Sequence, residues 1–234
     1  MNIGVLGTGA VGRTIGTGLV RAGHSVMMGS RTPEKATAVE WSRATGTDAA
    51  TGSFADAARF GTLLFNCTAG IASLQALEQC DADDLRGKTL VDVANPLDFS
   101  RGMPPTLTVC NTDSLGEQIQ RAYPATKVVK ALNTVNSDVM VDPALVEGDH
   151  MLLTCGNDAG AKAEVSDLLA RAFGWKPENI IDLGDIAAAR GTEAFLLLWV
   201  RLMGTLGTAH FNLRIAPPAL VEQVIADAPS RAPL

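Results

Sequence analysis

The segment Gly7-Thr8-Gly9-Ala10-Val11-Gly12 has the glycine pattern GxGxxG, and its place in the chain gives that pattern meaning. It follows the apolar run Ile3–Leu6 and precedes a helical pattern that ends at Gly23. In such a loop the first glycine allows a tight turn, the second lets backbone amides approach a pyrophosphate, and Gly12 lets the helix pack closely on the strand. The helix N-terminus adds partial positive charge for the phosphates. This context favours a dinucleotide-binding loop over a glycine-rich turn without a ligand.

A second polar stretch lies about twenty residues downstream, where such a unit usually carries an Asp or Glu that binds the ribose 2′-hydroxyl of NAD. This chain instead has Gly29-Ser30-Arg31, then Lys35, and its first carboxylate is Glu34. A hydroxyl, a guanidinium and an ammonium would bind a 2′-phosphate through charge-assisted hydrogen bonds of about 1.5–3 kcal/mol each. The alternative is that Arg31 and Lys35 are solvated charges at the start of a helix, but cations there oppose the helix dipole. We therefore predict that Ser30, Arg31 and Lys35 select NADP(H).

Short apolar runs alternate with longer helical patterns, which is typical of βαβ units. The sequence predicts an α/β fold: a Rossmann-type, doubly wound, mostly parallel sheet with a small C-terminal helical appendage. The expected strands are Asn2–Leu6, Ser25–Gly29, Leu63–Thr68, Thr89–Ala94, Thr106–Val109, Val128–Ala131, His150–Cys155 and Ile180–Leu183. The expected helices are Ala10–Ala22, Pro33–Ala44, Ala72–Gln79, Ser114–Ala122 and Ala159–Ala172.

The pattern changes near residue 184, so we expect an NADP-binding domain of residues 1–184 and a helical region of residues 185–234. Asp185 is placed to cap a long apolar helix from Ile186 to about Gly204. A short helix, Ala219–Ala226, and a frayed tail follow. This region is too small to close a substrate pocket alone, so we expect it to complete the acceptor pocket within a homodimer.

Composition excludes several classes of protein. The 234 residues are 47% hydrophobic and 19% charged, which allows a normal packed core. A net charge of −6 without any basic run argues against nucleic-acid binding.

The most apolar segment, Ala194–Val200, is too short to span a bilayer, and Met1 leads directly into the first strand without room for a signal peptide. The four cysteines and three histidines lack metal-ligand spacing, so we expect reduced thiols, no metal and a cytoplasmic protein without a membrane partner.

Four segments together resemble a known family. GTGAVG, GSRTPEKA, VVKALNT and LGDIAAARGTEAF, in this order and spacing, are similar to the NADPH-dependent F420 reductases (NADP oxidoreductases, coenzyme F420-dependent). The resemblance runs from Met1 to about Ile215. Many dehydrogenases share the glycine loop, whereas its combination with GSR-x3-K, VVKALNTVNS and the closing helix is far more specific. A looser similarity reaches the reductase domains of membrane metalloreductases.

The resemblance implies a set of cofactor and substrate contacts. Thr8, Gly9, Ala10 and Val11 would hold the pyrophosphate, Ser30, Arg31 and Lys35 the 2′-phosphate, and Thr68, Asn95 and Ser137 the ribose and nicotinamide. Asn133, where archaeal members carry His, would lie on the acceptor side. Phe211, near the end of the long helix, would lie against the hydride acceptor, and the adjacent His210 is either a substrate contact or an exposed helix-end histidine.

The activity that the resemblance implies is hydride transfer between NADPH and coenzyme F420 or a similar flavin-like acceptor. Such transfer depends on holding donor and acceptor carbons about 3–3.5 Å apart, and we assign no catalytic side chain. One alternative is NADPH-dependent reduction of a small imine, carbonyl or flavin, although imine and carbonyl reductases of this kind usually carry a longer helical domain. Another is a non-catalytic NADP(H)-binding sensor.

Charged residues outside these motifs yield two further expectations. The phosphate and glutamate tail of F420 would need local cations, and the candidates are Arg101, Lys127, Lys130, Arg201 and Arg214. Arg190 and Glu193 lie three apart on the predicted helix, so they could pair on its surface or act at a dimer contact.

Overall fold

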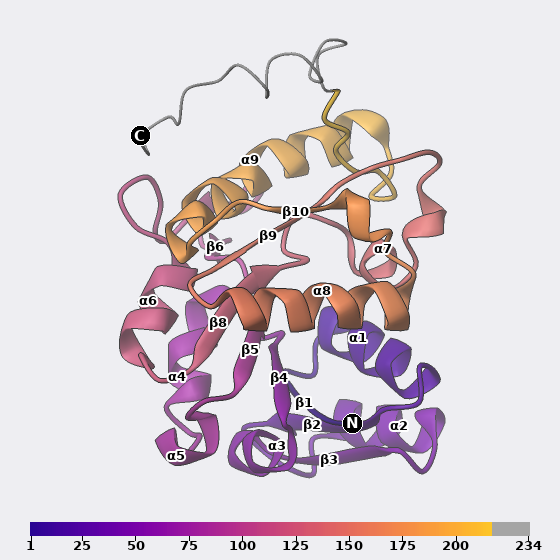
Figure 1. The fold of residues 1–234 in the computed structure, drawn as a ribbon, viewed down its shortest axis with the longest axis vertical. Helices are drawn as coiled ribbons and strands as arrows, with labels where there is room; N and C mark the ends of the chain where they lie inside the picture. Colours follow the sequence, from indigo (N-terminus) through magenta and orange to yellow (C-terminus); the bar gives the residue numbers. More distant parts are fainter. Residues whose placement is uncertain (217–234) are drawn as a thin grey trace.

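The computed structural model describes residues 1–216, so the expected helix Ala219–Ala226 and the tail beyond it lie outside the described residues. One eight-stranded sheet runs through the molecule in the order β10-β9-β8-β5-β4-β1-β2-β3 (Figure 1). Its strands are β1 (Asn2–Leu6), β2 (Ser25–Ser30), β3 (Ala49–Ser53), β4 (Leu63–Asn66), β5 (Thr89–Asp92), β8 (Lys127–Ala131), β9 (Leu152–Gly156) and β10 (Ile180–Asp182).

All pairs of neighbouring strands are parallel except β8 and β9, which are antiparallel. The direction of winding reverses between β1 and β4, because the chain first adds β2 and β3 on one side and then β4, β5 and β8 on the other. This is the doubly wound Rossmann order, and ligands of such sheets bind beyond the carboxyl ends of the strands at the reversal. The predicted fold class is therefore confirmed.

Helices cover both faces of the sheet. One core forms under α1 (Ala10–Arg21), α2 (Ala36–Thr45), α7 (Ser137–Val141) and α8 (Ala159–Phe173). The other forms under α3 (Phe54–Phe60), α4 (Ser73–Leu77), α5 (Ala82–Leu85) and α6 (Leu115–Ala122). Short 3-10 turns lie at Gly70–Ala72, Pro143–Leu145, Pro177–Asn179 and Ile186–Ala188. Because helices cover both faces of the sheet, both faces of its central strands are buried and these strands are largely apolar.

The pair β3 and α3 was not predicted from the sequence. Strand β3 has the sequence AATGS, which carries no apolar run, and it lies at the sheet edge beside β2. Helix α3 begins with a capping box, in which the Ser53 hydroxyl accepts the Asp56 N–H and the Asp56 carboxylate accepts the Ser53 N–H. Such a Ser-x-x-acidic start is a readable helix signal.

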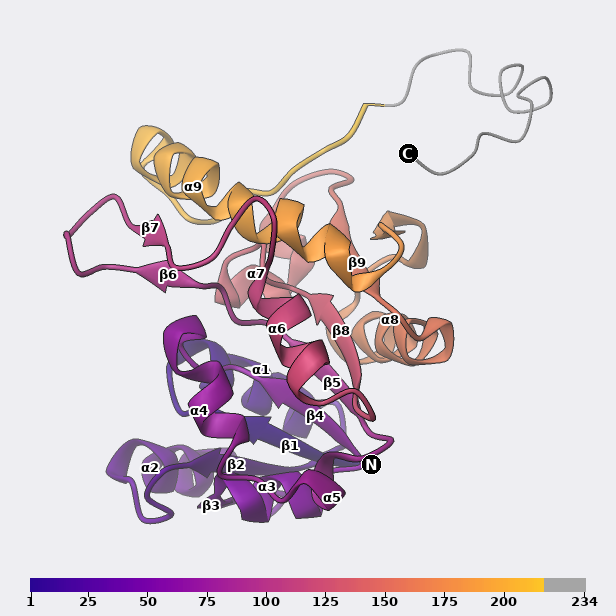
Figure 2. The ribbon, with the colours of Figure 1, turned by 90° about the vertical axis from the view of Figure 1, so that its left-hand side faces the viewer.

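The segment between β5 and α6 forms a hairpin outside the main sheet. Strands β6 (Leu97–Asp98) and β7 (Thr106–Leu107) pair with each other, so the predicted strand Thr106–Val109 does not join the central sheet. Figure 2 shows this hairpin projecting from the body, and its tip exposes Phe99 and Met103.

The last described helix, α9 (Ala189–Leu206), lies at the opposite end of the molecule from α2, α3 and α5 and packs beside α6 (Figure 2). The Asp185 carboxylate accepts the Ala187 N–H and caps the 3-10 turn Ile186–Ala188, and α9 itself begins at Ala189 rather than at Ile186. The helix ends at a left-handed Gly207. Its buried residues lie between Ala189 and Leu196, whereas Leu197, Leu198 and Leu206 are exposed. Within residues 1–216, no helix combines the length and apolarity needed to cross a membrane.

Candidate dinucleotide-binding site

The glycine loop lies against the end of strand β2. Gly7 has φ +118°, which favours glycine, and its N–H donates to the Gly29 carbonyl at 2.9 Å. This bond brings the loop to the neighbourhood of Ser30 and Arg31. Gly9 is the N-cap of α1 and provides no side chain to cap it, so the first-turn amides face outward for a ligand. A Cβ built on Gly9 would meet no atom within 4 Å, whereas one on Gly12 would clash with the Gly7 carbonyl oxygen.

A groove of about 730 Å³, which we call the Gly-loop groove, lies beside this loop. Gly7, Thr8 and Gly9 line it together with Ser30, Arg31 and Lys35, so the structure brings together the two motifs that the sequence singled out. Arg31 and Lys35 are exposed, and neither forms an ion pair with another residue in the described part of the chain. Ser30 is buried, and its hydroxyl donates to the Thr32 carbonyl.

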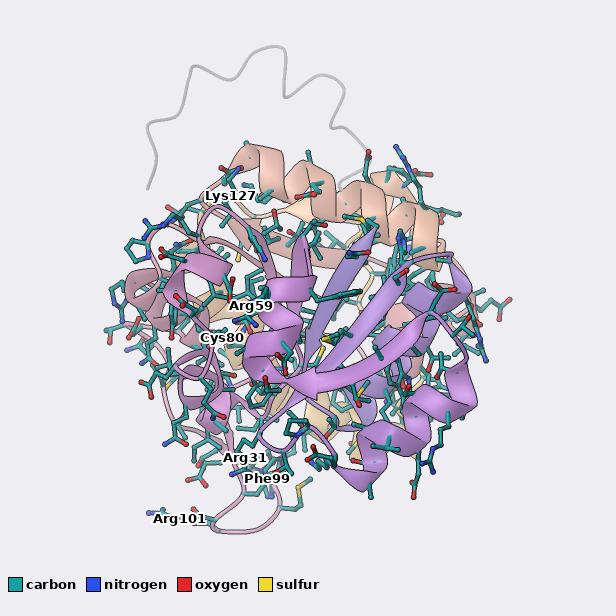
Figure 3. All side chains as sticks on the ribbon, turned by 90° about the horizontal axis from the view of Figure 1, so that it is seen from below. Arg31, Arg59, Cys80, Phe99, Arg101 and Lys127 are labelled. Atoms are coloured by element: carbon teal, nitrogen blue, oxygen red, sulfur yellow. The ribbon has the colours of Figure 1, made fainter. Side chains whose placement is uncertain are left out.

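Helix α2 begins at Ala36 rather than at Pro33 as the sequence indicated, and Lys35 is its N-cap. Its first turn contains no acidic residue. A cation at a helix N-terminus is unfavourable without a bound anion, so this arrangement leaves room and charge for one. Figure 3 shows Arg31 at the same end of the molecule as Phe99 and Arg101.

A second groove, of about 420 Å³, continues from the first, and we call it the Asn95 groove. The two grooves share Cys67, Thr68 and Ala69, which follow β4. Val11 and Asn95 line the second groove, and Leu97, Asp98 and Phe99 of the hairpin close its far side. A substrate that extends from the glycine loop past Thr68 therefore reaches Asn95.

Asn133 lies behind Asn95. The Asn95 amide donates to the Asn133 carbonyl at 2.8 Å, and the Asn133 amide donates to Asn95 Oδ1 at 3.0 Å. Asn133 is only 2% exposed, and it follows Leu132, a buried residue with φ +64°. Ser137 begins α7, whose N-cap is Asn136. Neither Asn133 nor Ser137 lines the two grooves, and Asn133 is connected to them through its bonds to Asn95.

Phe211 lies just beyond the long helix, close to its end as the sequence indicated. Helix α9 ends at Leu206, and Phe211 lies in the segment that follows, where its ring stacks on Trp199 with centroids 5.3 Å apart. His210 pairs with Asp138 at 3.1 Å, and the Asn212 amide donates to the Met151 carbonyl at 2.8 Å. Phe211 is not among the residues that line either groove.

Of the two alternatives for Arg190 and Glu193, a pair between them on the helix surface is wrong. Arg190 binds Glu117 of α6 with two hydrogen bonds of 2.9 and 2.6 Å. Glu193 is 1% exposed and accepts hydrogen bonds from the Leu115 N–H, the Gly116 N–H and Lys130. Helical spacing alone could not show this, because Lys130 and the α6 N-terminus come from distant parts of the chain.

Two of the expected F420-tail cations are not available. Lys130 is fully buried between Asp92 and Glu193, each 2.7 Å from its Nζ. Burial alone would lower the pKa of Lys130, but the two carboxylates outweigh it and the pKa lies above its ordinary value. Lys127 pairs with Asp158 at the amino end of β8, far from Arg31 in Figure 3.

The side chains that line the grooves do not include a group suited to acid–base work near neutral pH. Burial, and then the nearby Asp92, raise the pKa of the Cys67 thiol far above its ordinary value, so the thiol stays protonated. Hydrogen bonds from Ser100 lower the pKa of Asp98, so that carboxylate stays ionised. No cluster of His, Cys, Asp and Glu within residues 1–216 could hold a metal ion.

Comparison with known proteins identifies the family. Residues 2–96 match the family model described as NADP oxidoreductase, coenzyme F420-dependent. A crystal structure from Arthrobacter sp. FB24, of a protein provisionally named an F420-dependent NADP-reductase, is 50% identical, and the match covers 93% of this chain and 100% of that chain, with a TM-score of 0.88. The chain belongs to the family of F420-dependent NADP oxidoreductases.

Two more distant relatives match most of the length of this chain. The metalloreductase STEAP3 of Rattus norvegicus is 33% identical over 196 residues, which is 83% of this chain. This chain spans about a third of that relative's length, 36%. A reductive aminase from Aspergillus terreus, solved with NADPH and ethyl-5-oxohexanoate, is 18% identical with a TM-score of 0.63, and the match covers 87% of this chain and 62% of that chain. At that identity the likeness shows the fold alone.

Sequence reasoning missed Asn66, Ser73 and Asp92, which are fully buried polar residues beside Thr68. Asn66 and Asp92 end neighbouring strands β4 and β5 and pair in register with each other. A polar residue at the same point of two otherwise apolar strands is a signal that could have revealed them.

Proposed function

We propose that this protein transfers hydride between NADPH and coenzyme F420 or a similar flavin-like acceptor. The single observation that carries the proposal is the continuous path from Arg31 and Lys35, past the glycine loop and Thr68, to Asn95. One end of this path offers unpaired cations and free helix-terminal amides. The other end is a smaller, largely apolar groove suited to a planar ring.

The roles of the side chains follow from their places along this path. Thr8, Gly9, Ala10, Val11 and Gly12 form the turn and helix start that would hold the pyrophosphate. Ser30, Arg31 and Lys35 would hold the 2′-phosphate, with Ser30 rotating its hydroxyl away from Thr32. Thr68, Asn95 and Ser137 would contact the ribose and nicotinamide, and Asn133 would fix Asn95. Phe211 would bound the acceptor side, where its approach requires movement of the segment after α9.

The acceptor would enter between the hairpin and the nicotinamide. Arg101 projects from the hairpin (Figure 3). Of the five cations expected to bind the F420 tail, Arg101, Arg201 and Arg214 are exposed and form no ion pair within residues 1–216. Lys127 and Lys130 are each paired with a carboxylate, so we no longer propose that they bind the tail. The absence of a suitable acid or base in the grooves agrees with direct hydride transfer, in which positioning supplies most of the rate.

The division into residues 1–184 and 185–234, and the homodimer, remain proposals. Helix α9 exposes Leu197, Leu198 and Leu206, and exposed apolar side chains that gather on one element often mark a protein contact. We propose that a second copy covers these leucines and helps to bound the acceptor pocket. Replacing Leu198→Glu should yield a monomer by light scattering, and an unchanged mass would contradict the proposal.

A spectrophotometric screen tests the proposed function. NADPH oxidation would be followed by its absorbance with F420, FMN, FAD and a small cyclic imine, with and without EDTA. We expect turnover with F420 that EDTA does not change. Turnover with the imine or FMN and none with F420 would show that F420 is not the acceptor. Tight NADPH binding without any turnover would favour a non-catalytic NADP(H) sensor.

A further inference from the structure

A chain of buried polar side chains leads from the middle of the sheet to Thr68, whose hydroxyl lies where the two grooves meet. Lys130, Asp92, Asn66 and Ser73 are each 0% exposed, whereas Thr68 is half-buried. Polar groups in such surroundings must satisfy one another, because an unpaired donor or acceptor costs about 1–3 kcal/mol. The direction in which each proton points is therefore fixed by the chemistry of the chain.

The first half of the chain sets the orientation of the Asn66 amide. Lys130 can only donate, and it donates to Asp92 Oδ2 at 2.7 Å and to the Ala94 carbonyl. Both oxygens of the Asp92 carboxylate face groups that can only donate, because Oδ2 faces Lys130 and Oδ1 receives the Ala94 N–H at 3.2 Å. Its Oδ1 also receives the Asn66 amide at 2.8 Å. The NH₂ group of Asn66 must face Asp92, and its carbonyl oxygen must face Thr68.

The second half of the chain sets the direction of the Thr68 hydroxyl. Asn66 Oδ1 accepts the Thr68 hydroxyl at 2.7 Å and the Thr68 N–H at 3.3 Å. The second Asn66 amide proton goes to Ser73 Oγ at 3.1 Å. Ser73 then donates its own proton to Thr68 Oγ1 at 2.8 Å, since the alternative acceptor, the Ala69 carbonyl, lies at 3.4 Å. The Thr68 hydroxyl therefore donates its proton to Asn66 and accepts one from Ser73, which leaves one lone pair of Oγ1 to accept a hydrogen bond from a ligand.

We propose that Thr68 meets the bound dinucleotide as a hydrogen-bond acceptor, and that Asp92 and Asn66 are the positioning residues that fix this polarity. The inference rests on the proposed function, because it requires the dinucleotide to pass Thr68. The ligand group at that point is then an O–H or N–H donor: a hydroxyl of the ribose that carries the nicotinamide, or the carboxamide NH₂. A phosphate oxygen there would face a lone pair and is disfavoured.

Asp92→Asn tests the polarity with a change of one atom. The new amide would keep its carbonyl oxygen toward Lys130, so its NH₂ would face Asn66. The Asn66 amide would turn over to accept it, and its NH₂ would then face Thr68. The Thr68 hydroxyl could no longer donate to Asn66 and would point its proton toward Ser73 or the ligand. We expect NADPH affinity to fall about threefold to tenfold, the value of one neutral hydrogen bond.

Glu193→Gln is the matched control. It makes the same carboxylate-to-amide change beside the same Lys130, but Glu193 binds the α6 backbone and does not touch Asn66. We expect both variants to lower Tm, and only Asp92→Asn to weaken NADPH binding. Equal weakening by the two variants would show that Asp92 acts through stability alone and would overturn the proposal.

Ligand analogues identify the donor and separate this inference from the proposed function. The 3-acetylpyridine analogue of NADP⁺ lacks the amide N–H, and a nicotinamide-ribose deoxy analogue lacks one hydroxyl. Wild type should bind the matching analogue about threefold to tenfold more weakly than NADP⁺, whereas Asp92→Asn should bind the two ligands equally. If Asp92→Asn fails to fold, Thr68→Val should abolish the same difference, with Thr68→Ser restoring it.

Two outcomes distinguish failure of this inference from failure of the proposed function. If wild type binds both analogues as tightly as NADP⁺, Thr68 is not an acceptor and the inference is wrong. The fragment 2′,5′-ADP lacks the nicotinamide and the ribose that carries it, and with them both proposed donors to Thr68, so wild type and all variants should bind it equally. Failure of wild type to bind 2′,5′-ADP would instead contradict the proposed NADP(H) site.

Discussion

The two grooves differ in how their polar groups are satisfied. In the Gly-loop groove, Arg31 and Lys35 are exposed cations without ion pairs in the described chain, and Gly9 leaves the start of α1 uncapped. In the Asn95 groove, Asn95 and Asn133 bond to each other, and Thr68 bonds to Asn66 and Ser73. The first end is ready for an anion from a ligand. The second end is already held in place, so it presents a fixed surface to whatever lies on it.

Gly9→Val should have the largest effect of these variants, a loss of NADPH binding at the Gly-loop groove. The added side chain would occupy open space beside the loop, where the pyrophosphate would lie. We expect at least about a hundredfold loss of NADPH affinity by calorimetry, because the valine would exclude the phosphates from the helix-terminal amides. The Tm should stay close to that of wild type, because Gly9 has a φ of −70° that valine can adopt. Unchanged affinity would show that the glycine loop is only a turn.

Gly12→Val is the informative contrast. In contrast to Gly9, a Cβ on Gly12 would clash with the Gly7 carbonyl oxygen. Backbone cannot move aside as a side chain can, so we expect a lower Tm together with lost binding. A wild-type Tm for Gly12→Val would contradict the packing described here.

Arg31→Asp should reverse the cofactor preference at the same end. A carboxylate would repel the 2′-phosphate and favour a free 2′-hydroxyl. We expect the ratio of NADPH to NADH affinity, about tenfold or more in wild type, to fall about a hundredfold, since each charge-assisted bond is worth about 1.5–3 kcal/mol. Arg43→Asp, an exposed change on the adjacent helix α2 outside the groove, is the control. Equal changes in both variants would point to net charge rather than to a 2′-phosphate contact.

The sequence pointed to the Gly-loop groove because the glycines and cations that line one side of it lie within two short segments, 7–9 and 30–35. Local rules on glycine, helix ends and charge suffice for such a site. The Asn95 groove draws on residues near 68, 95 and 133, and its polar chain ends at Lys130 and Glu193. Lys130 looks like a free cation in a strand and Glu193 like a surface partner of Arg190, because only the tertiary fold shows that they bind each other. Strand β3 was missed for a related reason: its pairing with β2, and not its own apolar pattern, makes it a strand.

Phe211→Ala should affect the acceptor end alone. If Phe211 bounds the acceptor, kcat/KM for F420 should fall about tenfold, in the range of one lost aromatic contact, and NADPH affinity should stay the same. Because Phe211 also stacks on Trp199, the variant should lose some stability. Phe211→Tyr keeps the ring and is the control for packing. A loss of NADPH affinity in Phe211→Ala would show that the segment after α9 supports the cofactor instead.

The smallest expected effect is the salt dependence of cofactor affinity, which should differ between contacts in the Gly-loop groove and contacts in the Asn95 groove. The Debye length falls from about 30 Å at 0.01 M to about 3 Å at 1 M salt, so exposed charges lose attraction while buried hydrogen bonds do not. NADPH affinity should therefore fall severalfold across this range, because Arg31 and Lys35 are exposed, and NADH affinity should fall less. Arg31→Gln should flatten the NADPH response toward that of NADH. Parallel salt responses of NADPH and NADH in wild type would mean that the 2′-phosphate does not meet these cations, and the comparison between the two grooves would then lose its basis.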